Sequence, residues 1–285
     1  MKVGMNLFLW TDDPADEMWL PLYEKLKAIG FDGVELPIFD TQPEKFAKLG
    51  RRLDDLGLER TAITVRAPED DPISPDPKVR KNAVAASKRV IDCCEAVGAR
   101  LLGGPVYAAI GVFSGAGPTS DELARSVATM QEVADYAARP KIDLTFEFLN
   151  RFEIYLLNCT QDTARFVEAV DRTNVGIHYD TFHAHIEEKN PAAAIREHIS
   201  GITHVHISEN DRSTPGQGQV DWDTTFDALV ESGYDEWLTI EAFGSSLPSL
   251  AAATKIWRRM FVDEETLARD GHDFIRREWS KRKTK

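Results

Sequence analysis

The stretches VGIHYDTFH at residues 175–183 and ITHVHIS at residues 202–208 decide how this chain folds. Both are short runs rich in apolar, β-branched and aromatic residues, the composition of a buried strand. Two further runs of this kind are LTFEFLN at residues 144–150 and LTIEAF at residues 238–243. Near the end of each run stands an acidic residue or a histidine: Glu147, Asp180, His206 and Glu241.

The spacing of these four residues predicts parallel strands. Successive members are 33, 26 and 35 residues apart, close to the roughly 30 residues of one strand-plus-helix unit. Because parallel strands present their carboxyl ends at one edge of a sheet, three carboxylates and one imidazole should meet there. Such a group predicts a metal site with mostly oxygen ligands.

The rest of the chain repeats the same unit. Segments with helical periodicity separate the strand-like runs, and glycines such as Gly57 and Gly98 lie near the ends of the segments. Eight such units without a glycine-rich phosphate motif after the first strand favour a closed barrel over an open doubly wound sheet. We therefore predict an α/β fold, a (β/α)8 TIM barrel with a C-terminal helical extension. The eight expected strands are residues 2–10, 33–38, 59–66, 100–107, 143–150, 175–182, 202–208 and 238–243.

No sharp change of composition divides the chain, so we expect a single barrel domain over residues 1–285. The eighth helix is expected at residues 248–260, and residues 261–285 should form a helical tail. Residues from Lys281 to Lys285 should be frayed. The apolar residues that should pack the tail on the barrel or on a neighbouring subunit are Phe261, Leu267, Phe274, Ile275 and Trp279.

Two connections are longer than a barrel requires, residues 67–78 and residues 108–121. Both follow a strand, on the face where barrels keep their active sites, and are therefore candidate lids. They could equally be solvated surface loops. The second ends in Thr119-Ser120-Asp121-Glu122, which predicts a capping box at the start of the fourth helix.

Charge and cysteine content limit the possible partners. The 34 Lys and Arg against 47 Asp and Glu give a net charge of −13, which opposes binding to a nucleic acid. The odd number of cysteines (Cys93, Cys94 and Cys159) does not suggest a disulfide framework, so a reducing compartment is expected. Nothing resembles a signal peptide or a membrane span. We expect a soluble cytoplasmic protein with a small-molecule substrate, assembled as a homodimer or homotetramer.

The predicted ligand set suits a hard or borderline divalent ion such as Mn²⁺, Mg²⁺ or Co²⁺, and the absence of nearby thiolates argues against structural zinc. Any one of these residues could instead cap a helix or form an ion pair, but four at barrel spacing favour a metal. Three further polar residues follow the ligand-bearing strands: Glu153, His183 and Arg212. Each could hydrogen-bond a substrate at the barrel mouth, or form a surface ion pair.

Four longer segments carry a family resemblance. They are FEFLNRFEIYLLN at residues 146–158, YDTFHAHIEE at residues 179–188, HVHISENDRSTPGQGQVDW at residues 204–222 and EAF at residues 241–243. The chain resembles the ketose 3-epimerases (D-tagatose and D-psicose/allulose 3-epimerase) of the xylose-isomerase-like barrel superfamily, over essentially its whole length.

The resemblance implies a function. Glu147, Asp180, His206 and Glu241 match the metal ligands of the family, and Glu147 and Glu241 match its acid/base pair on opposite faces of substrate carbon 3. The implied reaction is epimerisation of a ketose at carbon 3 through a cis-enediolate, with Mn²⁺ (or Co²⁺ or Mg²⁺) and no organic cofactor.

The resemblance also implies substrate contacts. Glu153, His183 and Arg212 match contacts to the C1/C2 oxygen end of the sugar, and Glu35 matches another active-site carboxylate.

The chain departs from the family on the first and third strands. Asn6 stands where an aromatic residue is common, and Val65-Arg66 where small residues are usual; both positions should face the distal end of the sugar. Arg66 could therefore grip a carboxylate or phosphate of the substrate. The alternative, which we favour, is an ion pair with Glu69 or Asp70.

Three other functions compete. An aldose–ketose isomerase acting between carbons 1 and 2 would use the same ligand set. A DNA repair endonuclease would need more metal-binding residues and a basic face, which seven histidines and a charge of −13 disfavour. A non-catalytic sugar-binding protein would be indicated by a missing ligand, and none is missing.

Overall fold

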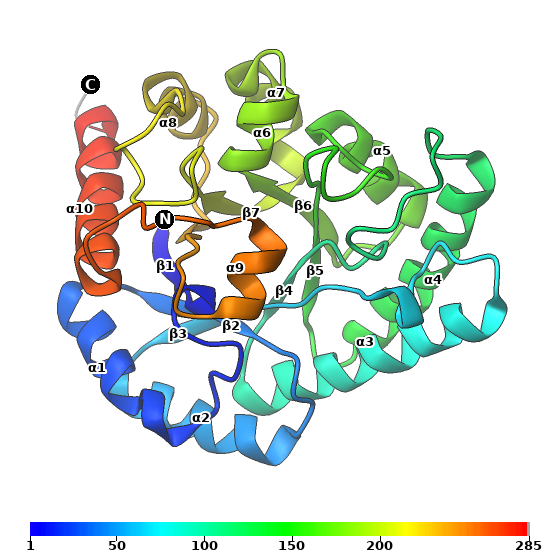
Figure 1. Ribbon diagram of the computed structural model, residues 1–285, viewed down its shortest axis with the longest axis horizontal. Coiled ribbons are helices and arrows are strands. Elements are labelled where there is room, and N and C mark those ends of the chain that lie inside the picture. Colours follow the sequence, from blue (N-terminus) through cyan, green and yellow to red (C-terminus); the bar gives the residue numbers. More distant parts are fainter. Residues whose placement is uncertain (284–285) are drawn as a thin grey trace.

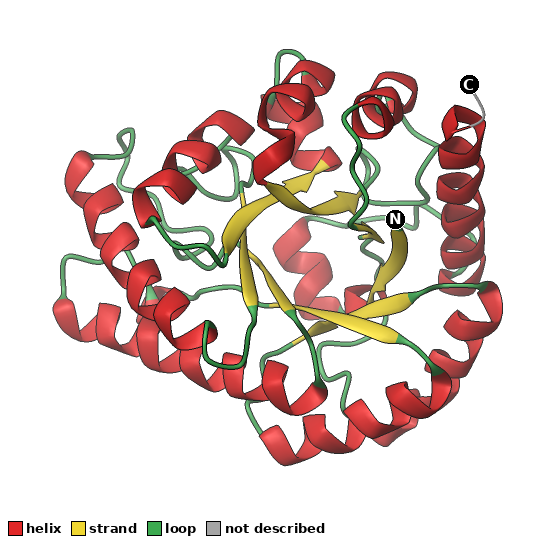
Figure 2. Cartoon of the chain, turned by 180° about the vertical axis from the view of Figure 1, so that it is seen from behind, coloured by secondary structure: helices red, strands yellow, loops and turns green. Residues whose placement is uncertain are grey.

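A computed structural model describes residues 1–283, and its eight parallel strands form a closed barrel. Each strand pairs with the next, and β8 pairs with β1. Figure 2 shows the strands enclosed by helices, so the predicted (β/α)8 barrel is confirmed. The strands are β1 (Lys2–Asn6), β2 (Gly33–Pro37), β3 (Glu59–Ile63), β4 (Leu101–Gly104), β5 (Asp143–Glu147), β6 (Val175–Asp180), β7 (Ile202–Ile207) and β8 (Trp237–Ile240).

Most of the helices wrap the outside of the barrel, whereas the helix over residues 248–254 lies inside their ring (Figure 1) and lines the cavity at the barrel mouth. None of those in residues 1–283 is long and apolar enough to cross a lipid bilayer. The α-helices are α1 (Leu20–Ile29), α2 (Pro43–Leu56), α3 (Pro77–Val97), α4 (Ser120–Ala137), α5 (Thr160–Val170), α6 (Thr181–Glu187), α7 (Pro191–His198), α8 (Trp222–Glu231), α9 (Pro248–Thr254) and α10 (Glu264–Lys283). Short 3-10 helices are η1 (Leu7–Leu9), η2 (Glu17–Trp19), η3 (Pro68–Asp70) and η4 (Ile199–Gly201).

All eight strands end earlier than their apolar runs predict, and after β1 and β6 the side chain at the strand end caps a helix. The Asn6 side chain accepts a hydrogen bond from the backbone N–H of Phe8 and ends β1. The Asp180 carboxylate accepts bonds from the backbone N–H groups of Phe182 and His183, so α6 follows β6 directly. The apolar runs continue beyond the strands because the following residues are also buried.

The C-terminal part differs from prediction in two places. Helix α9 ends at Thr254 rather than near residue 260, because Lys255 adopts a left-handed conformation with φ 62°. Helix α10 lies beside α1 and α8 (Figure 1) and continues to Lys283, so the frayed end expected from Lys281 is wrong for residues 281–283. Residues 284–285 lie outside the described part. Phe261 packs against the core. The predicted apolar residues of α10 are buried: Leu267, Phe274, Ile275 and Trp279.

The two long connections are tied together at their bases. The Asp71 carboxylate accepts hydrogen bonds from the backbone N–H groups of Ile73, at 3.2 Å, and Ala109, at 3.0 Å. Residues 113–119 are exposed. The capping box is confirmed: Thr119 Oγ1 accepts from Glu122 N–H, and the Glu122 carboxylate accepts from Thr119 N–H. The lid role of these loops stays a prediction.

The lumen of the barrel is polar at its carboxyl end. Successive inward-facing residues of a strand are two apart, so each predicted ligand has a neighbour one layer below it. This lower layer consists of four fully buried side chains: Thr145, His178, His204 and Thr239. The apolar core instead lies between the strands and the helices, where the Phe146 and Phe166 rings pack edge to face at 5.2 Å.

Candidate metal and active site

The four predicted ligand residues converge at the carboxyl end of the barrel. Glu147 and Asp180 end β5 and β6, His206 lies near the end of β7, and Glu241 follows β8. His206 Nδ1 is 3.5 Å from Asp180 Oδ2, 3.5 Å from Glu241 Oε1 and 3.8 Å from Glu147 Oε1. Adjacent ligands of an octahedral ion with bonds of about 2.1 Å lie about 3 Å apart. Small movements would therefore place all four around one ion.

The chemistry of the cluster also fits a divalent ion. One ligand atom from each residue lies within 4.8 Å of the others, and all four side chains are buried. His206 Nδ1 is buried and has no hydrogen-bond partner among residues 1–283, although three carboxylates surround it. An unpartnered imidazole nitrogen facing carboxylates is the arrangement expected of a metal ligand.

The carboxylates of the cluster differ electrostatically. Burial, and then the charge of Glu241, raise the pKa of Glu147 well above its ordinary value. Burial would also raise the pKa of Asp180, but Arg212 and the neighbouring histidines hold it well below its ordinary value. Arg212 Nη1 donates to Asp180 Oδ2 at 3.1 Å and to Glu241 Oε2 at 2.7 Å. The pKa values of these two ligand carboxyls are thus shifted in opposite directions.

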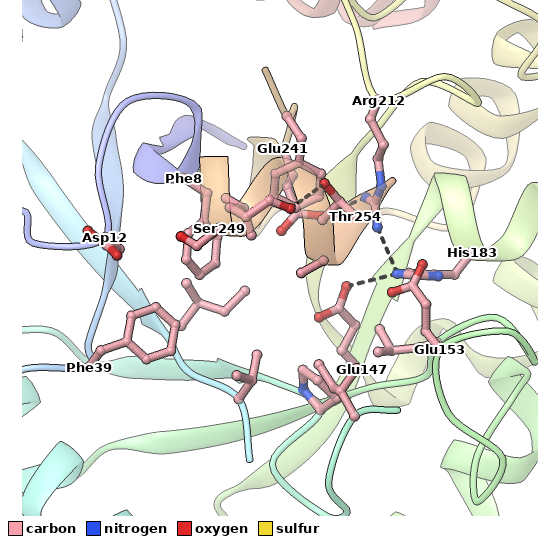
Figure 3. A pocket seen from close by; sticks show the side chains of 18 residues that line it. Phe8, Asp12, Phe39, Glu147, Glu153, His183, Arg212, Glu241, Ser249 and Thr254 are labelled. Carbon is pink, nitrogen blue, oxygen red and sulfur yellow. Dashed lines mark hydrogen bonds and ion pairs between the residues drawn. The ribbon is translucent and has the colours of Figure 1, made fainter. Parts of the chain in front are cut away.

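Glu153, His183 and Arg212 line the same cavity of about 460 Å³ as Glu147 and Glu241 (Figure 3). This volume lies within the range typical of small-molecule sites. Figure 3 shows these polar side chains gathered toward one end of the cavity. The structure therefore brings together the residues for which a contact with substrate was predicted at the C1/C2 end.

His183 is a buried imidazole whose two nitrogens both face protein groups. The backbone N–H of Asn150 donates to His183 Nδ1 at 3.0 Å, and His183 Nε2 lies 3.0 Å from Arg212 Nη2. Burial lowers the pKa of His183 to about 3, so the ring is neutral at working pH. The ring thus contacts the Arg212 guanidinium, which is the hydrogen-bond donor at this end of the cavity.

Arg212 stands on a loop that a buried carboxylate organises. The backbone at Arg212 is left-handed, with φ 61°, and its guanidinium lies 3.8 Å from the centre of the Phe182 ring. Glu209 is fully buried and accepts five hydrogen bonds, from the backbone N–H groups of Asn210, Gly216, Gln219 and Val220 and from Trp222 Nε1. A Cβ at Gly218 would lie 2.5 Å from the Glu209 carboxyl carbon, so only glycine allows this close wrap. Glu209 was not predicted from the sequence.

The opposite end of the cavity is mostly apolar. Figure 3 places Phe8 and Phe39 on the side away from Arg212 and His183. Ile63, Val65 and Leu250 also line the cavity, and Asp12 carries a charge on that side. Arg212 is the only arginine or lysine among the described residues that line the cavity.

Asn6 and Glu35, predicted to contact substrate, lie beneath the ligands instead. Both are fully buried and neither lines the cavity. The Asn6 side-chain amide donates to Glu35 Oε2 at 2.8 Å and, over 3.4 Å, to Glu241 Oε1. The Glu35 carboxylate contacts His206 Nε2, whereas the other nitrogen of the ring, Nδ1, faces the other ligands. Direct contact between either residue and a substrate is therefore not supported by this arrangement.

Arg66 also lies outside the cavity. Its guanidinium pairs with Asp70 at 2.8 Å, the ion pair that we favoured, and Nη2 donates to Thr64 Oγ1. The side chain lines a separate hollow of about 540 Å³ beside Arg89. Contact with the distal end of a substrate would require Arg66 to leave this ion pair.

His178 and His204 were missed by the sequence analysis. Both are fully buried two residues before a predicted ligand, and the His178 ring packs edge to face on the His206 ring at 4.0 Å. The patterns H-Y-D at residues 178–180 and H-V-H at residues 204–206 were available signals, because alternate strand residues share a face.

Comparison with known proteins decides the family. Residues 23–278 match the family described as xylose isomerase-like TIM barrel. The chain belongs to this family. A ketose 3-epimerase from Arthrobacter globiformis is 34% identical over 283 residues, covering 97% of this chain and 96% of the relative.

Two further proteins agree. An L-ribulose 3-epimerase from Mesorhizobium japonicum is 33% identical over 277 residues, covering 96% of this chain and 93% of the relative. The crystal structure of a Methylomonas D-allulose 3-epimerase in complex with D-allulose superposes with a TM-score of 0.91 at 28% identity, covering 98% of this chain and 97% of that one. The predicted resemblance and the predicted enzyme class, an epimerase or isomerase, are confirmed.

Proposed function

We propose that this protein epimerises a free ketose at carbon 3, using a divalent metal ion held by Glu147, Asp180, His206 and Glu241. The observation that carries the proposal is the position of Glu147 and Glu241. They come from strands three places apart in the barrel, both line the cavity, and both belong to the cluster that fits a metal ion. Two carboxyl groups that reach one substrate atom from different sides can exchange a proton between its two faces.

The metal ion, when bound, would supply the positive charge that makes the hydrogen beside the substrate carbonyl acidic. The chain's own groups would do the rest. One glutamate would take the proton from carbon 3, and the other would return a proton to the opposite face. Burial and the charge of Glu241 raise the pKa of Glu147, a shift in the direction that favours a general acid. The roles would exchange in the reverse direction.

The polar end of the cavity would orient the sugar. The Arg212 guanidinium is a donor and the Glu153 carboxylate is an acceptor, so together they match a carbonyl next to a hydroxyl group. The apolar far end, with Asp12 as its charged group, suits a neutral carbon chain better than a phosphate. We therefore propose a free, unphosphorylated ketose. The relatives named L-ribulose 3-epimerase and ketose 3-epimerase support this class.

The competing function is aldose–ketose isomerisation between carbons 1 and 2. It uses the same kind of ligand set, and the position of the exchanged proton separates the two reactions. The Mn²⁺-loaded protein is incubated in D₂O with free and phosphorylated ketoses of five and six carbons, and the deuterium is located by NMR after the metal is removed. Deuterium at carbon 3 of a free ketose supports our proposal. Deuterium only at carbon 1 or 2 would establish the isomerase, and no incorporation into any sugar would reject both.

Mn²⁺ is the ion that we propose, with Co²⁺ or Mg²⁺ as substitutes, because oxygen ligands with one imidazole suit these ions. A cytoplasmic homodimer or homotetramer remains our expectation. Light scattering coupled to size-exclusion chromatography measures the assembly directly.

A further inference from the structure

Glu35 forms the centre of a hydrogen-bond network that joins β2 to three other strands, β1, β3 and β7, beneath the ligands. Its Oε1 contacts His204 Nε2 at 2.8 Å and accepts from Thr61 Oγ1 at 2.9 Å. Its Oε2 contacts His206 Nε2 at 2.6 Å and accepts from Asn6 Nδ2 at 2.8 Å. All five side chains are at most 2% exposed. The carboxylate thus faces two groups at each oxygen.

The network determines which nitrogen of His206 faces the other ligands. An ionised carboxylate accepts hydrogen bonds only, so the ring proton of His206 must lie on Nε2. In the neutral ring, the lone pair of Nδ1 then faces Asp180 and Glu241, each 3.5 Å away. A rotation of the ring by 180° would break the 2.6 Å contact with Glu35, so the same contact also holds the ring orientation.

We propose that Glu35 is a positioning residue for metal binding, which fixes the Nε2–H tautomer and the ring orientation of His206 so that Nδ1 binds the ion. This inference rests on the metal site of the proposed function. It replaces the expected contact of Glu35 with substrate, which the buried position of the side chain does not support.

Glutamine cannot reproduce this network. An amide has one accepting oxygen, and its NH₂ group would face either the Asn6 and His206 donors or the Thr61 and His204 donors. In both orientations His206 loses its ionised partner. Removal of such a partner of a metal-binding histidine typically weakens metal affinity by about 10- to 100-fold.

The first experiment measures the affinity of the chelator-stripped protein for Mn²⁺ by isothermal titration calorimetry. Glu35→Gln is expected to weaken binding by about 10- to 100-fold. Thr61→Val is the matched control, because it removes a buried bond to the same carboxylate at the oxygen that does not face His206. We expect Thr61→Val to change the affinity by less than about threefold, whatever it does to the melting temperature. Equal losses in both variants would overturn the positioning role.

A second experiment uses the wild-type protein and so does not depend on whether Glu35→Gln folds. With ¹⁵N-labelled histidine and the diamagnetic ion Mg²⁺, the His206 ring should carry its proton on Nε2, with none on Nδ1. A proton on Nδ1 would overturn the inference. In Glu35→Gln that folds, we expect the Nε2–H signal to shift or to disappear by exchange with water.

The outcomes separate this inference from the proposed function. Wild-type protein that binds no Mn²⁺, Co²⁺ or Mg²⁺ would overturn both. Wild-type protein that binds Mn²⁺ and a folded Glu35→Gln variant with the same affinity would overturn the positioning role alone.

Discussion

Replacement of Glu209 by glutamine should destabilise the protein and disturb the loop that carries Arg212. Glu209 Oε1 accepts from the backbone N–H groups of Asn210, Gln219 and Val220 at 3.0 to 3.1 Å. Its Oε2 accepts from Gly216 N–H and from Trp222 Nε1, both at 2.9 Å. A glutamine keeps one accepting oxygen and points an NH₂ group at the other donors. At least two of the five bonds are therefore lost.

The size of the effect follows from the number of lost bonds. A buried donor left without a partner costs about 1–3 kcal/mol, so Glu209→Gln should lower the free energy of unfolding by about 2–6 kcal/mol. For a domain of this size, 1 kcal/mol corresponds to about 2–4 °C in melting temperature. Because the backbone N–H of Arg212 donates to the Glu209 carbonyl oxygen, kcat/KM should also fall, by up to about 10²-fold.

Chemical denaturation and thermal unfolding measure the change. Glu231→Gln is the control, because that carboxylate is 63% exposed and forms a surface ion pair with Arg196. Its loss should change the stability by no more than about 1 kcal/mol. If Glu209→Gln were as stable as the wild type within about 1 kcal/mol, the buried hydrogen bonds would not have the value that we assign to them.

Three further predictions test the site. Exhaustive chelation should abolish turnover and Mn²⁺ or Co²⁺ should restore it; turnover by protein that elemental analysis shows to be metal-free would contradict the metal dependence. Glu147→Gln and Glu241→Gln should each keep an oxygen ligand and bind Mn²⁺ while kcat falls by about 10²- to 10⁴-fold; a variant with near-normal kcat would reject the two-base mechanism. Arg66→Ala should remove the ion pair with Asp70, lower the stability by about 1–3 kcal/mol, and change kcat/KM equally for three ketoses that differ only beyond carbon 4; an altered ranking would instead support contact with the substrate.

The barrel and the ligand cluster could be predicted because both depend on local spacing. One ligand per strand-plus-helix unit places Glu147, Asp180 and His206 at one end of the sheet, whatever the helices contain. Strand ends were less predictable, because hydrophobicity reports burial and not hydrogen bonding. Leu149 and Tyr107 are buried beyond the ends of β5 and β4, so the apolar runs continue into the loops.

The supporting residues were harder to predict, because their partners are distant in the sequence. Glu35 and His206 are 171 positions apart, and their contact depends on barrel closure, which no local pattern specifies. Glu209 differs from an ordinary loop carboxylate only in the hydrogen-bond donors that surround it in the folded loop. For Arg66, the departure from the family pattern suggested contact with the substrate, whereas the acidic residue four positions later, Asp70, is its partner in the structure.

The polar lumen also indicates where this protein can gain resistance to heat. The lower layer of the lumen adds little hydrophobic stabilisation. That stabilisation comes from the apolar core between the strands and the helices, where Phe146 packs on Phe166. Thr145 and Thr239 are fully buried in the lower layer, and their hydroxyl groups have no hydrogen-bond partner among residues 1–283. Valine has nearly the same shape and would remove a buried hydroxyl without a partner, which costs about 1–3 kcal/mol of stability. Substitutions that raise the thermal stability should therefore begin inside the barrel, one layer below the metal cluster, and leave the apolar core between the strands and the helices unchanged.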